Sequence, residues 1–228
     1  MIMSNVDMSR QTIDVLKSFE VINKSIMVRE GKLLNTQSLG GNIIAEFSCE
    51  EEFPQTFAVY ELAQFLNGLS MFENSPSLRF GNPDYVTIFS GNRSAKYFFS
   101  DVSFVENSSP PRRVKFPEED VVMEFKLTQS DLESLFKAAG VYKINDLNVG
   151  VVDNEIQITL FDGDNDTNNT YSLVVPGTFS CESSVRFNIK HLIGMKGDYD
   201  VSITDGLITR WKHTSIDLVY YIATEDDE

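Results

Sequence analysis

Apolar and polar residues alternate along most of this chain, and a two-residue period predicts β-strands with one face in a core. In the first half, strands are expected at residues 25–29, 32–36, 43–47, 78–80, 85–89 and 95–99. In the second half, they are expected at residues 121–127, 147–152, 155–161, 171–175, 199–204, 207–212 and 216–223. Glycine-containing turns join many of them, as in antiparallel sheets. The acidic run Glu50–Glu52 is expected to form a solvated loop.

A helical period interrupts the strands at evenly placed segments, residues 9–19, 60–71, 128–139 and 189–195. Ser9 is the expected N-cap of the first helix. Thr128 is the expected cap of the third, with Asp131 completing a capping box. Each half therefore reads helix, strands, helix, strands. This order predicts an α+β fold with the helices on one face of antiparallel sheet.

The two halves share a short apolar motif, which indicates internal duplication. The motif comprises Phe57, Val59 and Leu62 in FAVYELAQFL, and Phe187, Ile189 and Leu192 in FNIKHLIGM. Between the halves, the run NSSPPRR at residues 107–113 contains consecutive prolines, which exclude a helix or central strand and predict an extended connector. The expected organisation is an N-terminal domain at 1–108, a connector at 109–120 and a C-terminal domain at 121–228.

Composition narrows the classes of function. With 42% apolar and 23% charged residues, the chain has the make-up of a globular protein with a core. It contains neither a secretory signal pattern nor an apolar run long enough to span a bilayer. Cys49 and Cys181 lie far apart, which predicts thiols with packing roles in a reducing compartment. The net charge of −15 opposes nucleic-acid binding, unless basic residues gather locally within an acidic surface.

The sequence contains no recognisable catalytic arrangement. His191 and His213 have no nucleophile or acidic partner at a familiar spacing, and no glycine-rich phosphate loop is present. The acidic run 162–166 resembles the start of a calcium loop, but Thr167 and Leu173 replace the glycine and glutamate that such a loop needs. We therefore interpret the run as an exposed hairpin loop, and expect no metal, no cofactor and no enzymatic activity.

Basic residues on or near the predicted helices are the remaining candidates for a functional surface: Arg10, Lys17, Lys137, Lys190 and Lys196. Charged residues on an exposed helix face are usually only solvated, so their meaning depends on whether the helices face one place. The 60–71 helix carries no lysine or arginine, which argues against a continuous basic surface. Aromatic residues such as Phe98 and Phe104 are expected to pack in a sheet core.

Several local runs resemble the sliding clamps of T-even-type bacteriophages, the processivity proteins of DNA polymerases. These runs are VLKSFEVINKSIMV from Val15, FAVYELAQFLNGLS from Phe57, FKLTQSDLESLF from Phe125, and the connector through residues 113–117. The resemblance spans nearly the whole chain and implies the DNA clamp fold, in which each half is a pair of βαβββ units. It further implies that three subunits close head-to-tail into a ring, with helices lining the hole and antiparallel sheets outside.

The same resemblance implies partners and sites. The five basic residues would face encircled duplex DNA without base contacts, inside an acidic rim. A C-terminal peptide of the DNA polymerase would enter a pocket formed by Val114, Phe116, Pro117, Tyr220 and Ile222. A clamp loader ATPase would open the ring, and late-transcription factors would be further partners. The protein would act in the cytoplasm of an infected bacterium, with no membrane partner.

Two other interpretations remain open. A monomeric processivity factor of similar fold would hold DNA by charge, which the net charge of −15 disfavours. A non-enzymatic phage structural or interaction protein with a duplicated β-rich fold would assign no role to the helix lysines.

Overall fold

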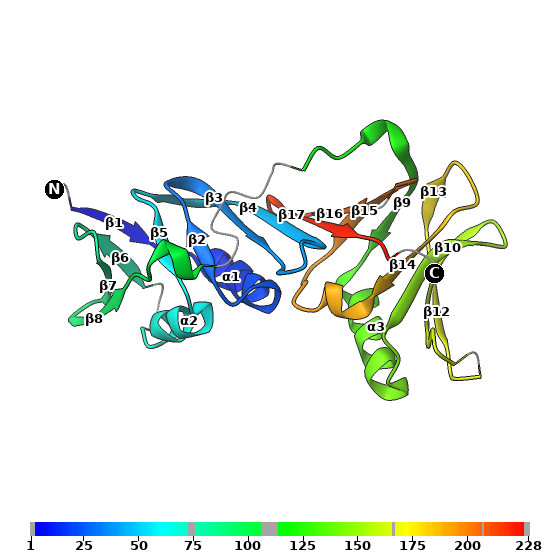
Figure 1. Ribbon diagram of the computed structural model, residues 1–228, viewed down its shortest axis with the longest axis horizontal. Helices are drawn as coiled ribbons and strands as arrows, with labels where there is room; N and C mark the ends of the chain where they lie inside the picture. Colours follow the sequence, from blue (N-terminus) through cyan, green and yellow to red (C-terminus); the bar gives the residue numbers. More distant parts are fainter. Residues whose placement is uncertain (1–2, 73–75, 106–113, 166, 207, 226–228) are drawn as a thin grey trace. The chain divides into compact units, whose positions relative to one another are not determined.

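The computed structural model describes residues 3–72, 76–105, 114–165, 167–206 and 208–225. The chain divides into two units, Met1–Arg112 and Arg113–Glu228, each with its own helices, sheets and core (Figure 1). Residues 109–113 of the expected connector lie outside the described residues, whereas its residues 114–120 are described. None of the helices within the described ranges is long and apolar enough to cross a membrane.

The first unit contains a four-stranded antiparallel sheet in the order β1-β6-β7-β8. Its strands are β1 (Ser4–Asp7), β6 (Ser77–Phe80), β7 (Tyr85–Ser90) and β8 (Arg93–Phe98). Two antiparallel pairs accompany it: β3 (Gly31–Gln37) with β4 (Ile43–Phe53), and β2 (Ile26–Val28) with β5 (Phe57–Val59). Strands β1 and β5 were not expected from the sequence.

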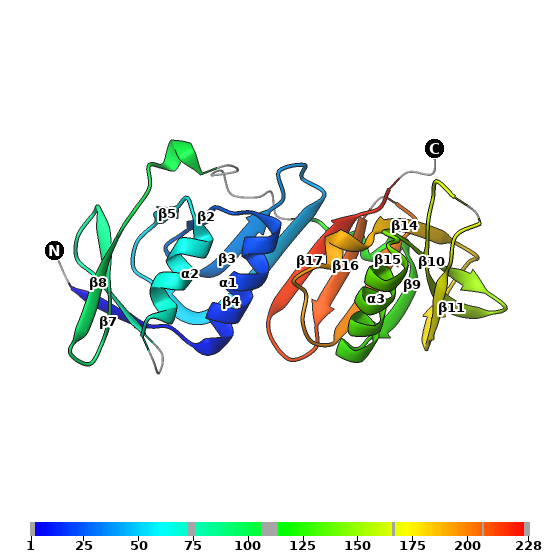
Figure 2. The ribbon, with the colours of Figure 1, turned by 90° about the horizontal axis from the view of Figure 1, so that it is seen from below.

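Helices α1 (Arg10–Ile22) and α2 (Leu62–Ser70) lie side by side in this unit (Figures 1 and 2). The expected cap of α1 is confirmed, because the Ser9 hydroxyl accepts a hydrogen bond from the Thr12 amide at 3.1 Å. The start of α2 is joined to the chain just after the C-terminus of α1, because the Leu62 amide donates a hydrogen bond of 2.7 Å to the Lys24 carbonyl. Their apolar faces are buried, so the polar faces are turned outward.

The expectation of a solvated loop at Glu50–Glu52 is wrong, because these residues continue β4. Glu51 is only 6% exposed. Its carboxylate accepts hydrogen bonds of 2.6 Å from the Ser9 amide and from the Thr12 hydroxyl, at the start of α1. Burial by itself raises the pKa of Glu51, but these hydrogen bonds outweigh it and hold the pKa below its usual value. The carboxylate thus ties the N-terminus of α1 to the strand beneath it.

Replacing Glu51 with Gln is expected to lower the free energy of unfolding at pH 7 by about 1–3 kcal/mol, since a charged acceptor of two hydrogen bonds is lost. A carboxylate with a lowered pKa stabilises the fold above its unfolded pKa of about 4.3, and this contribution disappears as the pH falls through the folded value. The gap between wild type and Glu51→Gln in denaturant titrations should therefore narrow below about pH 4.3. The exposed neighbour change Glu52→Gln is the control, and an equal effect there would contradict the assignment.

The second unit contains a four-stranded antiparallel sheet in the order β12-β11-β10-β14. Its strands are β10 (Asp146–Val152), β11 (Glu155–Phe161), β12 (Tyr171–Val175) and β14 (Ser184–Asn188). A further run of antiparallel strands follows the order β13-β9-β15-β16-β17. These strands are β13 (Gly177–Phe179), β9 (Val121–Leu127), β15 (Tyr199–Thr204), β16 (Ile208–His213) and β17 (Leu218–Ala223).

Helix α3 (Gln129–Tyr142) begins as the sequence predicts. Thr128 caps it, and the Thr128 hydroxyl and Asp131 carboxylate form the expected capping box with the backbone. The expected helix at 189–195 is wrong in type and length, since only the 3-10 turn η3 (Ile189–Leu192) forms. It lies beside α3 in both ribbon views (Figures 1 and 2). The turn ends at Ile193, whose backbone is extended with φ of −62° and ψ of 132°, and Gly194 follows with a φ of 92°.

The duplicated motif occupies equivalent places in the two units. In the first, β5 leads to α2, and in the second, β14 leads to η3. All six motif residues are at most 3% exposed: Phe57, Val59, Leu62, Phe187, Ile189 and Leu192. The repeat therefore marks the point where each strand enters the core and the chain turns into a helical segment.

Candidate DNA-facing surface and partner site

Two of the five candidate basic residues lie on α1. The side chains of Arg10 and Lys17 are 94% and 55% exposed. Asp14 lies between them, with its carboxylate 3.9 Å from Arg10 Nε and 2.7 Å from Lys17 Nζ. Exposed pairs of this kind are weak, so both cations remain able to exchange Asp14 for another anion. Helix α1 therefore carries two exposed cations but no net charge, because Asp14 and Glu20 lie on the same helix.

The other three candidates are exposed in the second unit. Lys137 lies on α3, Lys190 lies in η3, and Lys196 follows η3 in a loop. The Lys190 amide donates to the Asn188 side chain at 3.1 Å, and the Lys196 carbonyl accepts from the Tyr199 hydroxyl at 2.9 Å. These backbone bonds fix the chain while leaving both ammonium groups at the surface. Basic charge is thus spread over several elements and concentrated on none.

The candidate partner pocket begins with Val114, Phe116 and Pro117, which are all half-buried in the second unit. Phe116 packs on β16 and β17. The Arg210 guanidinium carbon lies 4.3 Å from the centre of its ring, and the Tyr221 ring lies 6.3 Å away. Arg210 and Tyr221 are directly opposite each other in the β16–β17 pair. These two residues were not expected from the sequence.

The assignment of Tyr220 and Ile222 to the same pocket is wrong. Their side chains are 1% and 0% exposed, so they belong to the core and offer no surface to a peptide. Strand residues alternate between faces, and the face that meets Phe116 is that of Tyr221. The sequence could not show this, because both faces of β17 carry apolar residues.

The outer edges of the two four-stranded sheets carry exposed apolar side chains. Strand β8 ends one sheet and strand β12 ends the other, with no further strand paired to either edge among the described residues. Phe98 on β8 is 64% exposed and Val174 on β12 is 49% exposed. The expectation that Phe98 and Phe104 pack in a sheet core is wrong, since Phe104 is also 64% exposed. Each of these two edges therefore exposes at least one apolar side chain to solvent.

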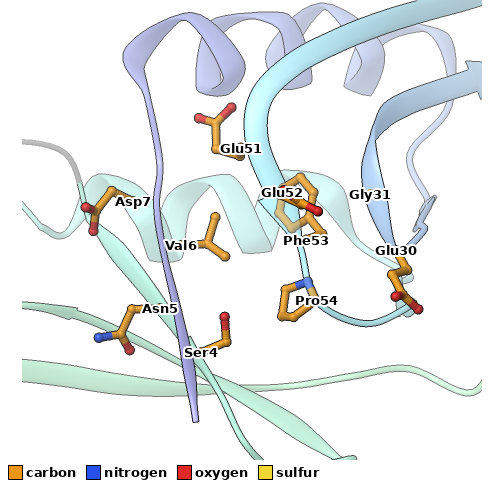
Figure 3. A pocket seen from close by; sticks show the side chains of 10 residues that line it. All are labelled: Ser4, Asn5, Val6, Asp7, Glu30, Gly31, Glu51, Glu52, Phe53 and Pro54. Atoms are coloured by element: carbon orange, nitrogen blue, oxygen red, sulfur yellow. The ribbon is translucent and has the colours of Figure 1, made fainter. Parts of the chain in front are cut away.

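A polar cavity of about 880 Å³ lies in the first unit beside β1 and the end of β4 (Figure 3). Figure 3 shows Glu51 turned toward α1, where its carboxylate accepts the hydrogen bond from Thr12. The acidic residues Asp7, Glu30 and Glu52 also line the cavity. Within the described ranges no group of His, Cys, Asp or Glu side chains is placed to hold a metal ion.

Burial accounts for the shifted pKa values of both histidines and of Cys49. Burial lowers the pKa of both His191 and His213, so both rings are neutral near pH 7. Burial, followed by the charge of Glu51, raises the pKa of Cys49 to about 12, which keeps that thiol protonated and unreactive. The expected packing role fits Cys49, which is buried, but is wrong for Cys181, which is exposed.

Solved structures identify the fold. Proliferating Cellular Nuclear Antigen from Entamoeba histolytica matches 98% of this chain and 98% of its own, with a TM-score of 0.72 and 13% identity. The PCNA of Thermococcus kodakaraensis matches 98% of this chain and 99% of its own, with a TM-score of 0.72 and 11% identity. The duplicated units therefore have the DNA clamp fold.

Sequence relatives give the family. No family model matches the chain. The sliding clamp of Vibrio phage KVP40 is 31% identical over 223 residues, which is 96% of this chain and 98% of that protein. The sliding clamp of Escherichia phage RB69 is 26% identical over 228 residues, covering 96% of this chain and 97% of that protein. This chain belongs to the phage sliding clamps, which confirms the resemblance seen in its sequence.

Proposed function

We propose that this sliding clamp closes as a homotrimeric ring around duplex DNA and tethers the replicative DNA polymerase, which makes synthesis processive. Tethering raises the effective concentration of the polymerase at the primer end without any new catalytic contact. The protein itself acts without enzymatic chemistry, metal or cofactor. It acts in the cytoplasm of the infected bacterium.

The observation that best supports a ring is the pair of open sheet edges at β8 and β12. Because the two edges belong to different units and differ in sequence, pairing β8 of one copy with β12 of the next makes a heterologous contact. Such contacts form a ring when the rotation closes, and we propose three subunits because the resemblance to phage clamps implies that number. Phe98 and Val174 would then become buried.

The basic residues support a weak, sequence-independent hold on DNA. Arg10, Lys17, Lys137, Lys190 and Lys196 are exposed in a chain whose net charge is −15. Phosphate contacts without base contacts position a protein on the duplex but read no sequence. A ring is retained by its closed shape, so scattered cations suffice and would not stop sliding.

The partner site is proposed at Val114, Phe116 and Pro117, together with Arg210 and Tyr221. A C-terminal peptide of the polymerase would bind there. A clamp loader ATPase supplies the energy for opening, and late-transcription factors are proposed as further ligands of the same site.

Light scattering over a range of protein concentrations tests the ring. We expect a mass of about three times 25.8 kDa that falls on dilution, because closed rings built from modest interfaces dissociate by mass action. A mass of 25.8 kDa at every concentration would overturn the ring and favour a monomeric factor.

A further inference from the structure

Arg210 holds the segment that follows the connector. Its guanidinium carbon lies 4.3 Å from the Phe116 ring centre, and its Nη1 donates to Oε1 of Glu118. Its Nη2 donates to the Ser202 hydroxyl at 3.2 Å, which fixes the plane of the guanidinium. One side chain, 22% exposed, thus binds an aromatic ring and a carboxylate that are two residues apart.

This contact has the form of a peptide bound to a surface. Arg210 and Tyr221, opposite each other on β16 and β17, form a floor on which the Phe116 ring rests. Glu118 is 64% exposed and reaches the guanidinium from the solvent side. An exposed ion pair and a cation–π contact are both weak, so the side chains of Phe116 and Glu118 can be displaced from Arg210.

We propose that Phe116 and Glu118 are internal stand-ins for the partner peptide. In the free protein they occupy Arg210, and a partner segment with an aromatic side chain and a carboxylate two residues later takes their place. This inference rests on the proposed partner site and specifies the chemistry of its ligand.

We include a carboxylate in the partner peptide because Arg210 loses its ion pair with Glu118 when Glu118 is displaced. A guanidinium that gives up Glu118 while largely buried is left with fewer hydrogen bonds, which costs free energy. A planar guanidinium matches a carboxylate better than any neutral group does. A purely apolar peptide would cover the floor without restoring the ion pair, so an aromatic–x–acidic segment is favoured over it.

The stand-in and a simple pocket wall make opposite predictions for Phe116. A wall residue contributes contacts, so its removal weakens binding. A stand-in competes with the ligand, and the measured dissociation constant is the intrinsic one divided by the fraction of open sites. Removing the ring therefore strengthens binding.

The test measures fluorescence anisotropy of a labelled C-terminal peptide from the cognate DNA polymerase, with wild type and three variants. Phe116→Ala is expected to bind about 3- to 10-fold more tightly than wild type. Arg210→Gln is expected to bind at least about 10-fold more weakly, since the charged hydrogen bonds are lost. Lys115→Ala changes an exposed neighbour and should bind like wild type. Circular dichroism confirms that each variant is folded.

The outcomes separate the two proposals. Tighter binding by Phe116→Ala together with weaker binding by Arg210→Gln supports the stand-in. Binding by wild type that weakens in Phe116→Ala overturns the stand-in and keeps the partner site. Absence of binding by wild type and every variant overturns the partner site itself and the stand-in with it.

Discussion

The triple variant in which Glu replaces Lys17, Lys137 and Lys190 is expected to extend primers only to the length that the polymerase reaches without a clamp. Each change removes a cation from a proposed DNA-facing element and adds an anion there. At α1, Glu in place of Lys17 would also face Asp14, whose carboxylate now lies 2.7 Å from the lysine ammonium. The ring interior would become repulsive to a phosphate backbone, so loading would fail.

A matched pair of double variants assigns this loss to position rather than to total charge. One double variant combines Lys17→Glu with Lys137→Glu. The other combines Lys32→Glu with Lys126→Glu, and both change the net charge by the same amount. Lys32 and Lys126 are exposed on strands β3 and β9, away from the proposed lining. Primer extension on singly primed circular DNA should fall for the first pair only. Equal loss in both pairs, or processive synthesis by the triple variant, would show that the DNA-facing assignment is wrong.

Replacing Phe98 with Asp is expected to dissociate the ring into subunits of 25.8 kDa. Phe98 is 64% exposed at the β8 edge, so the change should leave the fold of the subunit intact. In the ring each interface would lose the burial of one Phe side chain, about 2 kcal/mol, and would gain an unpaired carboxylate whose burial costs more. Because every interface carries the change, the effects accumulate around the ring.

Phe104→Asp is the control, because Phe104 is equally exposed but contacts Tyr60, away from the β8 edge. Light scattering should report a smaller mass for Phe98→Asp alone, while both variants keep the thermal unfolding midpoint of the wild-type subunit. Dissociation by Phe104→Asp to the same extent would place the interface elsewhere.

Features that depend on neighbouring residues could be predicted from the sequence. The bounds of β9, β11, β12 and β15 agree with the expected ranges, because clear alternation ends at turn residues. The capping box of α3 was predicted from Thr128 and Asp131, which need only each other and the local backbone. Family membership followed from runs that keep their order along the whole chain.

Features that depend on distant residues could not be predicted. Glu51 looks solvated in an acidic run, and its burial depends on Ser9 and Thr12, which lie 42 and 39 residues earlier. The face of β17 that meets Phe116 depends on sheet register, which a strand with apolar residues on both faces does not reveal. The lysines at and after η3 lie on a 3-10 turn and a loop because the segment is too short and glycine-rich to propagate an α-helix.

The open edges of β8 and β12 also affect the subunit before it meets its neighbours. A lone strand edge accepts any extended chain, and newly made copies would be prone to pair in irregular, non-closing stacks. The charge of −15 on each copy makes the copies repel one another, and this repulsion opposes irregular pairing between edges that do not fit. We therefore expect the negative charge of this protein to keep subunits with exposed strand edges apart until the correct edges pair.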